Sequence, residues 1–163
     1  MQKIKLFLLV LTALLVSSQC LTAQQESAPI MGPRRPGIIN PQTPANWVDD
    51  FEYAKTQALK KNQKMVLLFT GSDWCIWCKR MAKDFLNTPR FKEMAKSQFI
   101  PVYLDFPAKK TMPAKLKAQN EKLREEFTVP GYPTVVILSP KGERLADLSY
   151  DKNFLDDLDK LTK

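Results

Sequence analysis

Two cysteines three positions apart, Cys75 and Cys78, are the residues of this chain whose type and spacing could do chemistry. They follow the apolar run at 65–69, at a point where a strand would give way to a helix. Cysteines at this spacing on a helix lie on nearly the same face, at a separation that a disulfide tolerates. The pair can therefore open and close as a disulfide.

The two thiols are expected to differ in reactivity because they lie at different positions relative to the start of the expected helix. If Cys75 lies at or just before this start, its sulfur faces free backbone N–H groups and the positive end of the helix dipole. Both favour the thiolate, which is the attacking species. Cys78, one turn further in, is expected to be more buried and to resolve a mixed disulfide by attacking it.

The N-terminus is predicted to be a secretory signal peptide over residues 1–23. Lys3 and Lys5 precede an apolar stretch that is too short for a permanent membrane span, and small residues lead to Ala23. We therefore expect an exported protein, periplasmic or secreted. Lipid anchoring through Cys20 is the less favoured alternative, because Gln19 stands where a small residue is usual.

Cleavage after Ala23 would leave Cys75 and Cys78 as the only cysteines, and the chain has no histidine. A structural zinc site needs four ligands, and a cysteine hydrolase needs a histidine base. Covalent haem attachment needs a histidine where Lys79 stands. We therefore expect no metal and no cofactor. The possibility that the pair forms an inert structural disulfide is not excluded by these observations.

Length and charge limit the remaining classes. A chain of 163 residues is enough for one ordinary domain. The formal net charge is +8, but the basic residues are scattered among acidic ones. A nucleic-acid surface would need them clustered on one face, so we expect no nucleic-acid partner. We also expect the protein to be a monomer.

Residues 24–45 are predicted to be a flexible linker because prolines interrupt them throughout, and residues 46–163 to be the domain. Apolar spacing and turn residues predict the elements of the domain. The first expected helix is capped by Asn46, and its inward residues are Trp47, Phe51, Ala54, Ala58 and Leu59. Further helices are expected at 75–86, 88–96, 111–127 and 151–161. The expected strands are 65–70, 99–105, 134–138 and 143–148. This order predicts an α/β domain with a small mixed sheet and helices on both faces.

Two motifs together resemble the thioredoxin superfamily. One is Asp73-Trp74-Cys75-Ile76-Trp77-Cys78-Lys79, and the other is Val129-Pro130-Gly131-Tyr132-Pro133-Thr134 before a strand. The first is similar to exported bacterial thioredoxin-like proteins, among them the periplasmic C-terminal domain of the transmembrane thiol:disulfide interchange reductase. The resemblance implies a thioredoxin fold, a four-stranded mixed sheet flanked by helices, with an extra N-terminal helix.

The resemblance also implies roles for particular residues. Cys75 would be the nucleophile and Cys78 the resolving thiol. Pro133 would be a cis-proline beside them, and Tyr132 would offer backbone groups to an extended substrate. Trp74 and Trp77 would flank the disulfide as an apolar docking surface.

The implied activity is that of an exported thiol:disulfide oxidoreductase that reduces or isomerises protein disulfides. Its partners would be disulfide-containing client proteins and an upstream thiol electron donor, such as a membrane reductase. The alternative is a non-catalytic thioredoxin-like binding module in which the disulfide stays closed.

The chain departs from the family pattern at two places. Many thioredoxins have a buried Asp six residues before the first cysteine, where this chain has Phe69. The proton of Cys78 would then pass to water or to another carboxylate, for which Asp73 and Asp105 are the candidates. The intervening Ile76-Trp77 includes no histidine, which predicts a potential toward the reducing end, about −270 to −180 mV.

Overall fold

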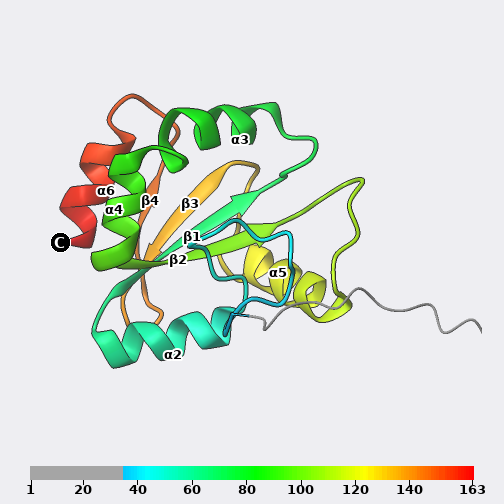
Figure 1. Cartoon of the computed structure of the whole chain (residues 1–163), viewed down its shortest axis with the longest axis horizontal. Helices are drawn as coiled ribbons and strands as arrows, with labels where there is room; N and C mark the ends of the chain where they lie inside the picture. Colours follow the sequence, from blue (N-terminus) through cyan, green and yellow to red (C-terminus); the bar gives the residue numbers. More distant parts are fainter. Residues whose placement is uncertain (1–34) are drawn as a thin grey trace, which may run out of the picture. The chain divides into compact units, whose positions relative to one another are not determined.

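The computed structural model describes residues 35–163, in which four strands form one mixed sheet in the order β2-β1-β3-β4 (Figure 1). The strands are β1 (Lys64–Thr70), β2 (Phe99–Asp105), β3 (Thr134–Leu138) and β4 (Arg144–Leu148). Strand β1 pairs in parallel with β2 and antiparallel with β3, which pairs antiparallel with β4. The predicted α/β class with a four-stranded mixed sheet is confirmed.

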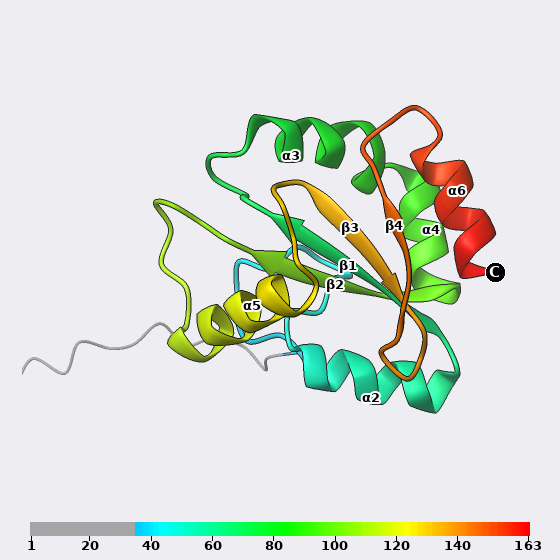
Figure 2. The ribbon, with the colours of Figure 1, turned by 180° about the vertical axis from the view of Figure 1, so that it is seen from behind.

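Helices cover both faces of this sheet. They are α2 (Phe51–Lys61), α3 (Ile76–Met81), the π-helical turn η1 (Ala82–Leu86), α4 (Pro89–Ser97), α5 (Ala114–Glu126) and α6 (Phe154–Thr162). Figures 1 and 2 show α2 and α5 on one face, and α3, α4 and α6 on the other. Across residues 35–163, no helix combines the length and apolar character that a membrane crossing requires.

The central strand β1 explains why its sequence is apolar throughout. Met65, Leu67 and Phe69 pack into the core under α2 and α5. The alternate residues Val66 and Leu68 pack into the core under α3, α4 and α6. Because successive side chains of a strand point to opposite faces, a strand covered on both faces needs no polar position.

The start of helix α2 was predicted wrongly. Asn46 lies in the left-handed region, at a φ of 72°, and the helix begins at Phe51 with Asp50 as its N-cap. The intervening residues are extended because Val48 forms a parallel bridge to Val102 at the edge of β2. Trp47 consequently packs on the face of the sheet opposite to α2.

The inner face of α2 is formed by Phe51, Ala54 and Ala58, which are buried as predicted. Leu59 was also expected to point inward, but its side chain is 53% exposed. Its helical position follows Ala58 directly, and neighbouring positions on a helix do not share a face.

Residues 35–45 already contact the rest of the domain. The buried Asp49 carboxylate accepts hydrogen bonds from the backbone N–H groups of Ile39 (2.6 Å) and Asn40 (2.9 Å), and from the hydroxyl of Thr43. Packing thus begins before Asn46, and the extent of a flexible linker stays a prediction. The predicted signal peptide and residues 24–34 lie outside the described residues.

The segment after the cysteines is divided into three pieces. The helix predicted at 75–86 is α3 followed by η1, and π-helical turns of this kind are frequent at functional sites. Helix α4 then begins at Pro89, with the Thr88 side chain accepting the N–H of Phe91, as predicted. Helices α5 and α6 each begin three residues later than predicted, at Ala114 and Phe154.

Candidate functional site

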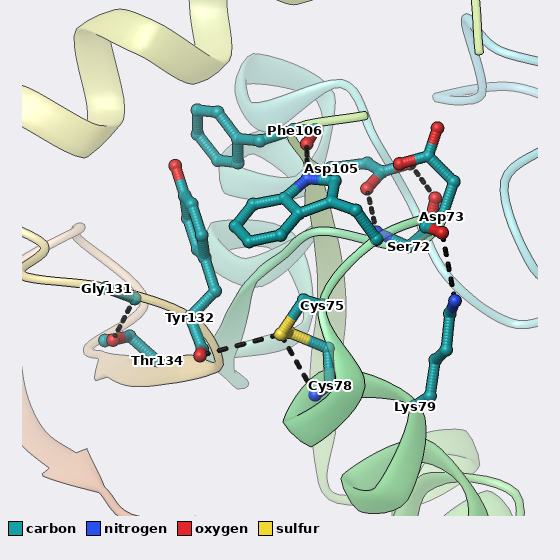
Figure 3. The surroundings of a disulfide bond; sticks show 11 residues. Ser72, Asp73, Cys75, Cys78, Lys79, Asp105, Phe106, Gly131, Tyr132 and Thr134 are labelled. Carbon is teal, nitrogen blue, oxygen red and sulfur yellow. Dashed lines mark hydrogen bonds between the residues drawn. A yellow bond between two sulfur atoms is a disulfide. The ribbon is translucent and has the colours of Figure 1, made fainter. Parts of the chain in front are cut away.

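The two cysteines form a disulfide at the start of α3, with their Cα atoms 5.3 Å apart (Figure 3). Cys75 is the N-cap residue of this helix, and its backbone is extended. Its Sγ accepts the backbone N–H of Cys78 at 3.1 Å. The condition stated from the sequence, that Cys75 lies at or just before the helix start, is therefore met, and its sulfur lies where free helix N–H groups favour negative charge.

Burial does not distinguish the two cysteines. Each is 5% exposed, so the expectation that Cys78 is more buried was wrong. The reason is that the loop carrying Tyr132 covers Cys75, whose Sγ lies 3.6 Å from the Tyr132 carbonyl oxygen. The two cysteines differ in their neighbours, because Cys78 lines a pocket of about 170 Å³ on the inner side of α3.

The loop that covers Cys75 ends in a cis peptide bond between Tyr132 and Pro133. Strand β3 begins at the next residue, Thr134, whose hydroxyl donates to the Gly131 carbonyl at 2.8 Å. The structure therefore places Tyr132 and the cis-proline beside the cysteines, the arrangement that the family resemblance implies.

Trp74, which directly precedes Cys75, packs against Tyr132 and Phe106, and Figure 3 shows these last two residues beside the disulfide. Its indole N–H donates to the Phe106 carbonyl at 2.8 Å, and its ring meets that of Tyr132 edge-on at 5.8 Å. Tyr132 in turn stacks on Phe106 at 4.9 Å. Trp74 stays 49% exposed, so this aromatic cluster presents apolar surface next to Cys75.

Trp77 does not join that cluster. Its ring lies 6.3 Å from that of Tyr150, and the guanidinium of Arg80 lies 4.8 Å from its centre. Trp77 and its neighbour Ile76 are 54% and 61% exposed. The first turn of α3 thus exposes two large apolar side chains beside the disulfide.

A second hollow, of about 590 Å³, lies next to the aromatic cluster. Trp74, Phe106 and Tyr132 line it, and Met112 and Lys117 are among its other lining residues. It is large enough to accept a side chain of a bound polypeptide.

Asp73 holds a neighbouring loop in place. Its carboxylate accepts the backbone N–H groups of Ala108 (2.9 Å), Lys109 (2.7 Å) and Lys110 (2.9 Å). These hydrogen bonds, led by the one from Ala108, lower the pKa of Asp73 to about 2. Lys79 donates to the Asp73 backbone carbonyl at 2.9 Å, which ties the loop to α3 as well.

Asp105 lies at the end of β2 and is only 8% exposed. Its carboxylate accepts the backbone N–H of Ser72 at 2.9 Å and the Ser72 hydroxyl at 2.6 Å. The two aspartates named from the sequence therefore have different surroundings, since one binds loop amides and the other binds a serine near Cys78.

Phe69 occupies the position where many thioredoxins have an aspartate. It is fully buried, and its ring lies 6.4 Å from those of both Phe106 and Phe127. An apolar side chain fills this part of the core, so no carboxylate is present there.

Sequence reasoning missed three residues of the site. Ser72 links Asp105 to the cysteine loop, the Phe106 carbonyl anchors Trp74, and Tyr150 contacts Trp77. No local pattern marks them. Phe106 and Tyr150 lie on segments that only the completed fold brings to α3.

A Cys-x-x-Cys disulfide at a helix start, beside a cis-proline that precedes an antiparallel strand, on a sheet covered by helices on both faces, defines the thioredoxin-fold class. Residues 46–140 match the family model of thioredoxin-like proteins, Thioredoxin_7. The chain belongs to this family.

Relatives and solved structures agree with this assignment. The chain is 30% identical, over 63% of its length, to the disulfide bond reductase DsbH of Chlamydia pneumoniae, and it spans 62% of that relative. A solved structure of a DsbH oxidoreductase gives a TM-score of 0.66 at 27% identity, covering 80% of this chain and 92% of the other. The disulphide isomerase from Xylella fastidiosa Temecula1 gives 0.54 at 17% identity, covering 79% and 100%, and shares the fold.

Proposed function

We propose that this chain is an exported thiol:disulfide oxidoreductase that reduces or isomerises protein disulfides through Cys75 and Cys78. The observation that carries the proposal is the position of the Cys75 sulfur. It caps α3, accepts the Cys78 N–H at 3.1 Å and faces the Tyr132 carbonyl beside a cis-proline. A sulfur so placed is favoured as a thiolate and lies at a surface where a polypeptide can bind.

The reaction begins from the reduced pair. The Cys75 thiolate attacks a client disulfide, a mixed disulfide forms, and one client sulfur leaves as a thiolate. The Cys78 thiol then loses its proton and attacks Cys75 Sγ. The bond between Cys75 and the client breaks, the protein pair becomes the disulfide, and the client cystine is reduced to two thiols. An upstream thiol donor returns two electrons to the pair.

The surroundings of Cys75 suit an extended client chain. Tyr132 offers backbone groups next to the sulfur, as in recognition by strand addition. Trp74 and Trp77 are about half exposed and lie near Cys75 along the chain, so both can contact apolar client residues. A client side chain next to the attacked cystine would enter the hollow beside Trp74.

The setting follows from the N-terminal sequence. Export to the periplasm or secretion is proposed from the signal-like residues 1–23, with lipid anchoring at Cys20 as the less favoured variant. The partners proposed are disulfide-containing clients and a thiol electron donor such as a membrane reductase. The protein would act as a monomer without nucleic acid.

A non-catalytic binding module is the second candidate, and one observation favours it. Ile76, Trp77 and Trp74 are each about half exposed or more, and a surface of this kind can bind a partner without chemistry. In that case the disulfide between Cys75 and Cys78 would stay closed.

The test is mechanism-based trapping in the native host. A Cys78→Ser variant keeps the nucleophile but cannot resolve, so it should accumulate mixed disulfides that reductant releases and mass spectrometry identifies. The Cys75→Ser variant and the double variant should trap none. If Cys78→Ser traps nothing and the wild-type protein fails to reduce insulin with a thiol donor, the binding module replaces the catalyst.

A further inference from the structure

The resolving step requires Cys78 to lose a proton, and no carboxylate stands at the position where many thioredoxins have one. Cys78 lines the pocket of about 170 Å³ together with Thr70, Ser72 and Tyr103. This volume is enough for several water molecules, and the hydroxyl groups provide polar partners for them. Among the described residues that line the pocket, none is Asp or Glu.

Asp105 reaches this pocket through Ser72. The Ser72 hydroxyl donates to one carboxylate oxygen at 2.6 Å, while the Ser72 N–H donates to the other at 2.9 Å. The backbone of Asp105 is fixed by Asn120, whose side-chain amide donates to its carbonyl at 2.9 Å. A buried carboxylate held by two hydrogen bonds to one residue keeps a defined direction toward that residue.

We propose that Ser72 and Asp105 form a relay that accepts the proton of Cys78, with water in the pocket between Cys78 and Ser72. The inference rests on the proposed function, since it concerns the resolving step of that reaction. It assigns to Asp105, on β2, a proton-accepting task for which Phe69 on β1 is unsuited.

The step balances as follows. The Cys78 thiol gives its proton to water, the water gives a proton to Ser72 Oγ, and Ser72 gives its own hydroxyl proton to Asp105. The Cys78 thiolate then attacks Cys75 Sγ, the protein disulfide forms, and the client sulfur leaves with the electron pair of the broken bond. The leaving thiolate takes a proton from solvent, and Asp105 releases its proton to solvent through Ser72 and the water of the pocket, which restores the carboxylate.

The other titratable groups around Ser72 and Asp105 are not suited to accept the proton of Cys78. Burial and the charge of Asp105 raise the pKa of Tyr103, so its phenol keeps its proton. Lys79 carries donors only and binds the Asp73 backbone carbonyl. The Asp73 carboxylate is occupied by three loop amides.

Asp105 also lines the larger hollow, which Cys78 does not line. The charged side chains that line that hollow with it are Lys110, Lys117 and Glu121, and the phenol of Tyr132 completes the titratable groups there. These groups face Asp105 from the loop after β2, from α5 and from the cis-proline loop, and they do not line the pocket of Cys78.

The relay can be tested with a small disulfide that needs no docking surface. The reduced full-length protein, carrying Cys20→Ser so that Cys75 and Cys78 are its only thiols, is mixed with substoichiometric dithiobis(nitrobenzoate), and released thionitrobenzoate is followed by stopped flow. The first release reports attack by Cys75, and the second reports attack by Cys78. The variants are Asp105→Asn, Ser72→Ala and, as a conservative control that keeps the hydroxyl, Ser72→Thr.

We expect Asp105→Asn to slow the second release about 10²-fold near neutral pH, the low end of what general base catalysis contributes. Its rate should climb steeply from about pH 6 to about pH 9, because hydroxide must then remove the proton, whereas the wild-type rate should change less. The first release should stay unchanged, which also shows that the start of α3 is intact. Ser72→Ala should slow the second release, and Ser72→Thr should restore it.

The relay is overturned if Asp105→Asn and Ser72→Ala retain the wild-type second release and its pH profile. It is equally overturned if Asp73→Asn shows the slowing and Asp105→Asn does not. If Asp105→Asn does not fold, the contrast between Ser72→Ala and Ser72→Thr decides. A wild-type protein that shows both releases but does not reduce insulin would contradict the proposed function and leave the relay standing.

Discussion

Helices α2 and α3 begin with the same local geometry, but the capping atom differs. In α2, the Asp50 carboxylate accepts the N–H of Tyr53 at 3.0 Å. In α3, the sulfur of Cys75 accepts the N–H of Cys78 at 3.1 Å. An oxygen at this position stabilises the helix, while a sulfur there is itself stabilised as a thiolate. The same N-cap hydrogen bond therefore stabilises the helix at the start of α2 and positions a reactive sulfur at the start of α3.

Each helix start is also preceded by a carboxylate that holds a distant loop. Asp49 accepts the N–H groups of Ile39 and Asn40 before α2, and Asp73 accepts three N–H groups at 108–110 before α3. The first is buried inside the domain, whereas the second lies at the rim next to exposed Trp74. The start of α3 thus combines a fixed backbone with an open surface.

The largest expected effect separates capping from chemistry. Cys75→Ser should abolish insulin reduction, a loss of at least about 10³-fold, because serine cannot form the mixed disulfide. Serine is a good N-cap, so the free energy of unfolding should match that of the reduced wild-type protein. Turnover assays and urea denaturation under reducing conditions measure the two. A large loss of stability would mean that the sulfur caps better than we infer.

A smaller effect is expected at the open surface of α3. Trp77→Ala should raise the KM for insulin about fivefold, ~1 kcal/mol, and leave kcat near its original value, because an exposed aromatic is lost from the docking surface. Leu59→Ala is the matched control, since Leu59 is 53% exposed but lies at the far end of α2. Equal KM values for both variants would remove Trp77 from the docking surface.

At the start of α2 the effect should fall on stability alone. Asp50→Ala should lower the free energy of unfolding by about 1 kcal/mol, because the N–H of Tyr53 loses its acceptor. The rate of insulin reduction should stay unchanged. A change in that rate, with no change in stability, would break the comparison between the two helices.

The smallest expected effect is confined to acid. The loop amides lower the pKa of Asp73 from 3.8 to about 2. A carboxylate whose pKa is lowered by folding contributes stability that is complete above the pKa of the unfolded chain. That stability is lost as the pH falls toward the pKa of the folded protein, about 2. Asp73→Asn should therefore flatten the loss of stability between about pH 4 and about pH 2, as followed by thermal unfolding. An unchanged acid limb would show that the carboxylate does not hold the loop.

Much of the fold could be predicted from short-range pattern. Strands β1, β2 and β3 were predicted almost to the residue, because continuous apolar runs end at polar or turn residues. The start of α2 was not, because Trp47 and Phe51 share a helical spacing but pack on opposite faces of the sheet. The bridge from Val48 to Val102 causes this, and no local signal encodes a pairing over that distance.

The site divides in the same way. The spacing of Cys75 and Cys78 predicts their helix start, and the resemblance adds the cis-proline at Pro133. The different surroundings of Asp73 and Asp105 could not be predicted, because they depend on which loop reaches each carboxylate. Both are aspartates near the end of a strand, and the folded backbone alone gives one of them loop amides and the other Ser72.

The central claim is that the capping sulfur of Cys75 is the nucleophile, and selective alkylation of the reduced protein tests it most directly. Iodoacetamide at neutral pH reacts with thiolates, and mass spectrometry of quenched samples gives the modified fraction of each cysteine over time. The account predicts that Cys75 is modified at least about tenfold faster than Cys78. Equal rates, or faster modification of Cys78, would contradict it.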